Sequence, residues 1–262
     1  MQTGLRNRVA VIAASSKGIG RAAAFAMAAE GVNLALCARN SDVLEDTAKQ
    51  IRSDFDAQVY TEPFDVGDDE RVRSFIEAAH VQFGRIDICV TNAGGPPAKT
   101  FAETTMEEWD RAYELNLRSI VSFAHAVLPH MRRQQWGRLI TITSIAAKQP
   151  VAELVLSNSV RAGVLGLVRS LATQYGGDNI TVNNVGPGYT ATERVQELAQ
   201  ANALTTGRSV AEYEAQVTKD IPMRRLAQPE EVADAIVWLA SERASYITGQ
   251  TILVDGGVYR GL

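Results

Sequence analysis

A glycine-containing turn near the N-terminus has the residue types and spacing of a phosphate-binding site. Gly18 and Gly20 follow a short apolar run and open a segment with helical periodicity. Glycines at a strand-to-helix turn let the backbone approach a pyrophosphate, which the amide groups of the helix N-terminus then bind. The sequence therefore predicts a dinucleotide site formed by six consecutive residues. These residues are Ser15, Ser16, Lys17, Gly18, Ile19 and Gly20.

Two basic residues indicate which nicotinamide dinucleotide would bind. About 20 residues beyond the glycine turn, an NAD-binding protein usually carries an acidic residue that binds the ribose 2′-hydroxyl. This chain has Ala38 and then Arg39 at that place, and Lys17 lies in the turn itself. Because a guanidinium and an ammonium group together can bind a 2′-phosphate, the pattern favours NADP(H) over NAD(H).

The elements that must position these residues alternate along the chain. Short apolar strands between helical segments are typical of a parallel sheet covered on both faces. We therefore predict an α/β fold, a single doubly wound parallel sheet of Rossmann type, with residues 1–262 as one catalytic domain. The expected strands are Val9–Ala14, Val32–Ala38, Gln58–Thr61, Ile86–Thr91, Arg138–Thr143, Ile180–Val185 and Gln250–Val254. The expected helices lie near 20–30, 42–55, 69–83, 107–134, 155–176 and 229–241.

One segment interrupts the alternation. Residues about 189–223 show weak helical patterns without a strand. An insertion of this kind is either a lid or substrate-binding loop, or an ordinary surface excursion. Ligands of doubly wound sheets bind at the carboxyl ends of the strands, so we expect the chemistry just after each apolar run.

Composition excludes several classes of protein. Lys and Arg number 26 against 30 Asp and Glu, and this mildly acidic balance argues against a nucleic-acid binder and against a polybasic membrane anchor. No apolar run approaches the roughly 18 residues of a membrane span. Cys37 and Cys89 lie inside apolar runs, which favours buried thiols. We expect a cytoplasmic protein that acts on a small molecule.

Other catalytic classes find little support. His80, His125 and His130 form no metal-binding motif, so no metal is expected. The GxSxG elbow of many serine hydrolases does not occur.

Further motifs, in order along nearly the whole chain, resemble those of the short-chain dehydrogenase/reductase family, and most closely the beta-ketoacyl carrier-protein reductases. The glycine turn is similar to the family's TGxxxGIG, with Ala14 at the first glycine. The resemblance implies an adenine site, a segment after the fourth strand and a turn beside the nicotinamide carboxamide. In this sequence they are Asp65 and Val66; Asn92, Ala93 and Gly94; and Pro187, Gly188, Thr190 and Thr192. It also implies that Asn116 and Ser144 belong to the catalytic tetrad.

The family's YxxxK motif is altered. In the family the tyrosine is the general acid/base, and the lysine lowers its pKa and holds the nicotinamide ribose. By alignment of the following residues, Ser157 replaces the tyrosine and Arg161 the lysine. A serine hydroxyl is a far weaker acid than a phenol, and a permanently charged guanidinium binds ribose hydroxyls but cannot relay a proton. The spacing of four still places both residues on one helix face.

Three interpretations remain open. In the first, the chain is an NADP(H)-dependent oxidoreductase that reduces a carbonyl, 3-oxoacyl or similar, or a conjugated C=C. Dienoyl-thioester reductases of this family also carry serine in place of the tyrosine. The substitute proton donors, in order of preference, are Lys148, Tyr189 and Glu153.

The second interpretation is an NADP(H)-binding protein with little or no activity, acting as a sensor or assembly partner. In the third, Ser144, Ser157 and Asn116 hold water or substrate for a reaction without redox chemistry.

The long helices near 107–134 and 155–176 carry apolar or small residues on more than one stripe. The resemblance implies a homotetramer, or a homodimer, in which these helices form the interface. An apolar substrate pocket is expected from five residues near the altered motif and in the insertion. They are Val151, Leu154, Val195, Leu198 and Leu204.

Overall fold

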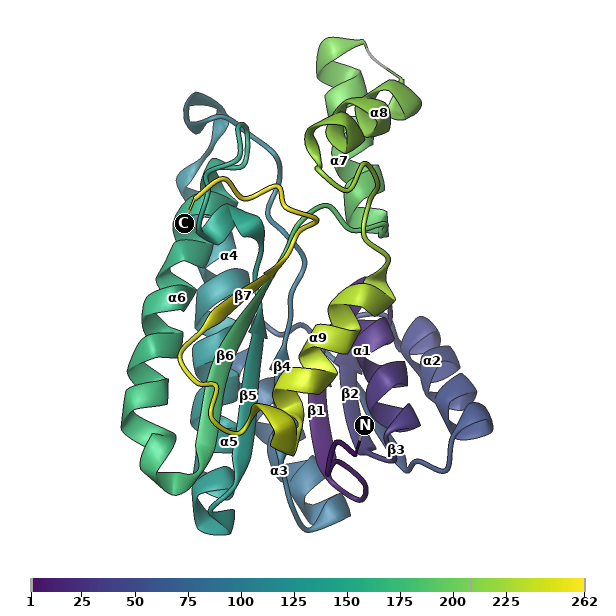
Figure 1. Cartoon of the computed structure of the whole chain (residues 1–262), viewed down its shortest axis with the longest axis vertical. Coiled ribbons are helices and arrows are strands. Elements are labelled where there is room, and N and C mark those ends of the chain that lie inside the picture. Colours follow the sequence, from purple (N-terminus) through teal and green to yellow (C-terminus); the bar gives the residue numbers. More distant parts are fainter. Residues whose placement is uncertain (1, 208, 262) are drawn as a thin grey trace.

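A seven-stranded parallel sheet forms the centre of the computed structural model, which describes residues 2–207 and 209–261, without the side chains of residues 201 and 204–206. The strand order is β3-β2-β1-β4-β5-β6-β7, and every paired strand is parallel to its neighbour (Figure 1). The strands are β1 Val9–Ala13, β2 Asn33–Ala38, β3 Val59–Pro63, β4 Ile88–Thr91, β5 Gly137–Ile142, β6 Ile180–Pro187 and β7 Thr251–Val254. The predicted α/β fold is confirmed.

Helices connect the strands. They are α1 Gly18–Ala29, α2 Ser41–Asp54, α3 Asp69–Phe83, α4 Met106–Tyr113, α5 Ser119–Gln134, α6 Val155–Tyr175, α7 Glu193–Thr206, α8 Val210–Asp220 and α9 Pro229–Ala240. Short 3₁₀ turns are η1 Phe101–Glu103, η3 Ile145–Ala147, η4 Gly176–Asp178 and η5 Glu242–Ala244. The single helix expected near 107–134 is wrong in one respect: a π-helical turn, η2 Glu114–Arg118, separates α4 from α5.

Local sequence signals explain where these helices begin and end. The Asp68 carboxylate accepts hydrogen bonds from the first amides of α3, and Gly84 ends that helix at a φ of 72°. Pro229 occupies the first turn of α9, and Glu231 completes its capping box. Side-chain caps satisfy amides that the helix leaves unpaired, and glycine accepts the left-handed conformation at a helix end.

Two apolar cores lie on opposite faces of the sheet. Residues of α1, α2 and α9 pack on one face, where Ile12 and Leu34 belong to the core. Residues of α3, α5 and α6 pack on the other face, where Val11 and Cys89 belong to the core. Alternate residues of β1 thus serve different cores, as the period of two in a strand requires. Cys37 and Cys89 are buried free thiols, and burial raises the pKa of both.

The strand order reverses beside β1, which pairs with β2 on one side and with β4 on the other. In open α/β sheets the crevice at such a reversal, outside the carboxyl ends of the strands, is where ligands bind. The segment 189–223 holds α7 and α8, which stand beyond this edge of the sheet in Figure 1.

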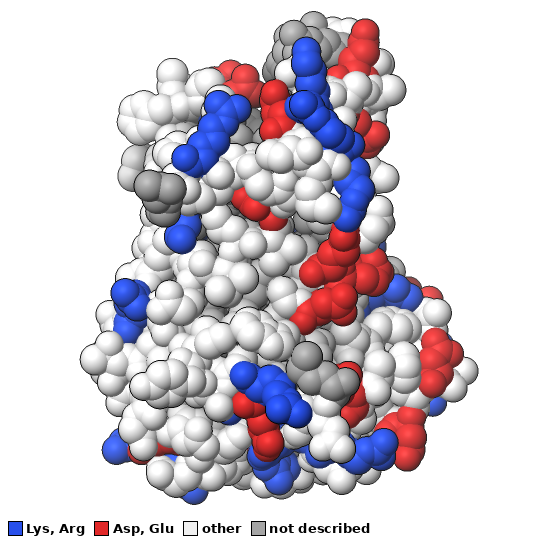
Figure 2. Space-filling model, in the orientation of Figure 1, with Lys and Arg blue, Asp and Glu red and all other residues white. Residues whose placement is uncertain are grey.

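On the face shown in Figure 2, basic and acidic side chains are interspersed over the surface. None of the described helices combines the length and apolar character needed to cross a lipid bilayer.

Candidate active site

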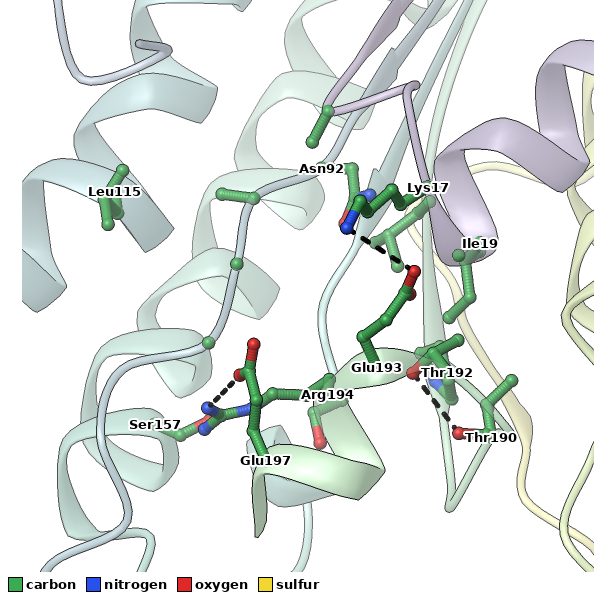
Figure 3. Close-up of a pocket in the computed structure, with 18 of the residues that line it drawn as sticks. Lys17, Ile19, Asn92, Leu115, Ser157, Thr190, Thr192, Glu193, Arg194 and Glu197 are labelled. Carbon is green, nitrogen blue, oxygen red and sulfur yellow. Dashed lines mark hydrogen bonds and ion pairs between the residues drawn. The ribbon is translucent and has the colours of Figure 1, made fainter. Parts of the chain in front are cut away.

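A cleft of about 880 Å³ lies at the carboxyl ends of the central strands, beneath α7 (Figure 3). Its walls bring together most of the predicted cofactor and catalytic residues. They are Ser16, Lys17, Gly18, Ile19, Arg39, Asp65, Val66, Asn92, Ala93, Gly94, Ser144, Ser157, Arg161, Pro187, Gly188, Tyr189, Thr190 and Thr192. Residues separated by up to 176 positions in the sequence therefore meet in one site.

Five predicted residues lie outside this lining. Ser15 is buried and donates a hydrogen bond to the Cys37 carbonyl at 3.2 Å, and Gly20 lies under the glycine turn. Asn116 is buried behind the cleft wall, to which its neighbour Leu115 contributes. Lys148 is exposed, and its ammonium nitrogen lies 5.5 Å from the centre of the Tyr259 ring. The structure therefore does not bring Lys148 to the cleft, and the same holds for the weaker candidate Glu153.

The glycine turn, predicted to bind phosphate, is built by close backbone packing. Ala14 and Gly18 have positive φ angles of 50° and 52°, and α1 begins at Gly18. A Cβ atom on Gly20 would lie 2.3 Å from the Ala14 carbonyl oxygen, so only glycine allows α1 to start this close to β1. No side chain caps the first turn of α1, which leaves its amides available to an anion.

Charged side chains flank this turn. Lys17 contacts Glu193 at 3.8 Å (Figure 3), and Arg39 is exposed directly after β2. Asp65, after β3, accepts hydrogen bonds from the Gly67 amide and the Arg111 guanidinium. Burial alone would raise the pKa of Asp65, but these two donors outweigh it and lower the pKa below its usual value. Asp65 therefore stays ionised at neutral pH.

Helix α6, which carries Ser157 and Arg161, faces the same cleft. Ser157 and Arg161 are each 6% exposed, and the Nη1 atom of Arg161 donates to the Ile142 carbonyl at 3.3 Å. Burial, together with the positive charge of Arg194, lowers the pKa of Arg161 to about 10, so it remains charged at neutral pH. The start of α6 is fixed by Asn158, whose amide group bonds both the amide and the carbonyl of Val151, at 3.1 and 2.9 Å.

Ser144 and Asn116 lie on either side of this helix start. The Ser144 hydroxyl accepts a hydrogen bond from the Ala146 amide at 3.1 Å and so begins the turn η3. Asn116 lies in the π-helical turn and is 2% exposed. Its Nδ2 donates to the Ala112 carbonyl at 3.3 Å, while its Oδ1 has no partner among the described residues. This orphaned buried oxygen is a place where a donor from water or a ligand would fit.

Tyr189 provides a phenol within the cleft wall. It follows the Pro187-Gly188 turn at the end of β6. Burial, with the negative charge of Asp220, raises the pKa of Tyr189, so its hydroxyl keeps its proton at neutral pH. Tyr189 is therefore the one sequence-predicted substitute donor that lines the cleft among the described residues.

The sequence did not single out three charged residues of the cleft: Glu193, Arg194 and Glu197, all on α7. Figure 3 shows Arg194 extending from the start of α7 toward the side of the cleft that carries Ser157. The only sequence signal for these three residues was that they lie in the insertion. The helical periodicity of the insertion was too weak to predict which of its side chains would face the cleft. Four expected apolar residues also line the cleft, whereas the side chain of Leu204 lies outside the described part of the chain. The four are Val151, Leu154, Val195 and Leu198.

Comparison with known proteins gives matches along almost the whole chain. The family model described as enoyl-(acyl carrier protein) reductase matches residues 13–259. A putative ketoacyl reductase of the monensin polyketide synthase from Streptomyces virginiae is 35% identical over 254 residues, which cover 96% of this chain and 97% of that protein.

Solved structures agree with these matches. L-sorbose reductase from Gluconobacter frateurii, crystallised with NADPH and L-sorbose, superposes with a TM-score of 0.95 at 35% identity, with all of both chains covered. An NADPH-bound short-chain oxidoreductase from Pseudomonas aeruginosa PAO1, described as containing an atypical catalytic center, gives 0.89 at 33% identity, covering 97% of this chain and 98% of that one.

Proposed function

This chain belongs to the short-chain dehydrogenase/reductase family, and from that premise we propose that it is an NADPH-dependent reductase of a carbonyl compound or a conjugated enone. The observation that carries the proposal is the single cleft in which the phosphate-binding turn meets Ser144 and the altered helix. The NADPH complexes of the two solved relatives support the same cofactor.

The residues of the cleft fit the cofactor. Because Gly20 lacks a side chain, α1 can pack close to Ala14, and the first residues of α1, Gly18 and Ile19, line the cleft where a pyrophosphate would bind. Lys17 and Arg39 supply positive charge for the 2′-phosphate, and Asp65 stands at the adenine end. Pro187, Gly188, Thr190 and Thr192 would hold the nicotinamide carboxamide. When bound, the cofactor supplies a hydride to the substrate.

Proton transfer is assigned to Tyr189. The Ser144 hydroxyl would donate a hydrogen bond to the substrate oxygen, since its own acceptor position is taken by the Ala146 amide. An alkoxide is a stronger base than a phenolate, so Tyr189 can protonate it although its pKa is raised. Arg161 takes the place of the family lysine at the nicotinamide ribose, and Ser157 leaves space where the family tyrosine would stand.

The second candidate function remains a cofactor-binding protein with little activity. It is favoured by the environment of Tyr189: burial and the negative charge of Asp220 both raise its pKa, and no cation among the described residues lowers it. In that case Tyr189 would pack against the cleft without taking part in chemistry.

We also propose that the protein forms a homotetramer or homodimer through α5 and α6. The outer face of α6 exposes small residues, including Ala162, Gly163 and Gly166, which would allow a second copy of the helix to approach closely. Analytical ultracentrifugation tests this assembly, and a monomer at micromolar concentration would contradict it.

Cofactor titration followed by a substrate panel tests the function. We expect micromolar NADPH binding, weaker NADH binding, and NADPH oxidation with at least one ketone or enone. Tyr189→Phe should lower kcat by at least about tenfold while leaving NADPH affinity unchanged, and the exposed Lys148→Met should leave both unchanged. Turnover that Tyr189→Phe preserves but Lys148→Met abolishes would overturn the assignment of the donor. NADPH binding without turnover across the panel would support the second candidate.

A further inference from the structure

Two arginines lie at the substrate side of the cleft, and one of them has no acidic partner. Arg161 is 6% exposed, and within the described part of the chain its one hydrogen bond is to the Ile142 carbonyl. No Asp or Glu among the described residues is a cause of its pKa shift, and its charge is therefore left without a counter-charge there. Burying a charge without a counter-charge is unfavourable, so an anion that entered the cleft would stabilise this guanidinium.

Arg194 approaches from the opposite wall. Its guanidinium lies against the loop after β4, where it donates to the Pro96 carbonyl and would meet a Cβ on Gly95 at 2.9 Å. Glu197 accepts from it at 3.4 Å, but the Glu197 side chain is 64% exposed against 32% for Arg194. Solvent therefore screens the glutamate more than the arginine.

The two guanidiniums act on one another. The charge of Arg194 adds to burial in lowering the pKa of Arg161 to about 10, and Arg161 remains protonated at neutral pH. Glu193 is engaged with Lys17 on the far side of the start of α7 (Figure 3), so it does not neutralise this pair. Among the charged side chains that line this side of the cleft, two arginines and the exposed Glu197 leave about one unbalanced positive charge, whereas Glu153 and Asp220 lie outside the lining. Apolar walls formed by Val151, Leu154 and Leu198 adjoin it.

The phosphates of the cofactor do not account for this charge. The pyrophosphate turn is at Gly18 and Gly20, and the basic residue for a 2′-phosphate is Arg39, after β2. Arg161 instead bonds the end of β5, next to Ser144, where a substrate would react. The anion that satisfies the arginine pair must then come from the substrate.

We propose that this chain reduces a substrate that carries a carboxylate, which the Arg194 guanidinium binds within the field of Arg161, while an apolar body packs on the segment before α6 and on α7; this inference rests on the proposed reductase function. One unbalanced positive charge matches a carboxylate better than a phosphate monoester, which carries nearly two negative charges. The planar fork of arginine also fits a carboxylate through two hydrogen bonds.

The proposal can be tested by measuring the binding of two small molecules that the enzyme is not expected to reduce, so the test does not depend on catalytic activity. Hexanoate and hexanamide have the same shape and differ in charge, and each is titrated by calorimetry into the protein saturated with NADPH. Hexanoate should bind at least about tenfold more tightly, because its hydrogen bonds with arginine are charge-assisted. Arg194→Gln should abolish this preference. The control Arg132→Gln, whose partner Asp178 lies at the other end of the sheet, should keep it.

A second variant, Glu197→Gln, distinguishes a loss of anion binding from a structural effect of Arg194→Gln, because it leaves Arg194 in place. It removes the competing acid, so hexanoate affinity should rise about two- to fivefold. The proposal would be overturned by equal binding of the two probes, by absence of hexanoate binding, or by a preference that survives Arg194→Gln. NADPH binding is measured in the same samples, and if it persists, the proposed reductase function is not refuted by these results. Failure of wild-type protein to bind NADPH would refute both.

Discussion

Alanine at Gly20 tests the packing on which the cofactor site depends. Its Cβ would lie 2.3 Å from the Ala14 carbonyl oxygen and 3.1 Å from Nδ2 of Asn92. Real Cβ contacts stay beyond about 3 Å, so the start of α1 would have to move by about 0.7 Å or more. Overpacking of this kind costs about 1–3 kcal/mol, which in a chain of this size lowers Tm by about 2–12 °C.

The same displacement moves the amides that would bind the pyrophosphate. A shift of this size weakens charge-assisted hydrogen bonds worth about 1.5–3 kcal/mol each, so NADPH affinity should fall at least tenfold. Differential scanning fluorimetry and NADPH fluorescence titration measure the two effects. Gly176→Ala is the matched control, because Gly176 has a φ of −58° and a Cβ there meets nothing within 4 Å. If Gly20→Ala kept both the Tm and the NADPH affinity of the wild type, the close approach of α1 to β1 would be refuted.

Three further predictions concern charge. Arg39→Ala should weaken NADPH binding at least about tenfold and leave NADH binding unchanged, as competitive titration would show; an equal loss for both cofactors would contradict its role at the 2′-phosphate. Glu193→Gln frees Lys17 from its ion pair and should raise NADPH affinity two- to fivefold by calorimetry, whereas reduced affinity would mean that Glu193 itself helps to bind the cofactor. Burial, with the charge of nearby His80, holds the pKa of His130 below its usual 6.5, despite the hydrogen bond with Glu77. Below pH 6.5 the unfolded chain then binds a proton that the folded chain does not, so the free energy of unfolding in urea should fall from pH 7.5 to 5.5. His130→Gln should flatten this dependence, and an unchanged slope would contradict it.

The strands and the phosphate turn were predictable because their signals are local. The apolar runs that become β1 and β4 are buried on both faces of the sheet, so nearly every residue in them is apolar. The turn at Gly18 and Gly20 follows from strand, glycine and helix in direct succession. These features depend on neighbours in the sequence, and sequence reasoning located them to within a few residues.

Features that depend on packing between distant segments escaped prediction. The π-helical turn at Glu114–Arg118 lies inside an uninterrupted helical pattern, without a glycine or proline to mark it. Lys148 was the first choice as proton donor because it follows Ser144 by four residues, yet η3 and the contact with Tyr259 place it away from the cleft. Arg194 enters the cleft only because α7 packs over the loop at Pro96, 98 residues earlier in the chain.

One side of the cleft is formed mainly by backbone groups and glycines, and the other mainly by side chains. Side chains on the second side can therefore be exchanged while the backbone of the first side stays the same. Backbone groups and glycines form the turn where we propose that phosphate binds, and a Cβ at Gly20 would disrupt it directly. The side where we propose proton transfer consists of side chains on α6 and the segment around α7, among them Ser157, Arg161 and Tyr189. A serine in place of the family's tyrosine would remove an acid and open space, while an arginine in place of its lysine would keep the positive charge. That charge would still act on an anion in the cleft, so we expect these two positions to affect the choice of proton donor and substrate more than the binding of the dinucleotide.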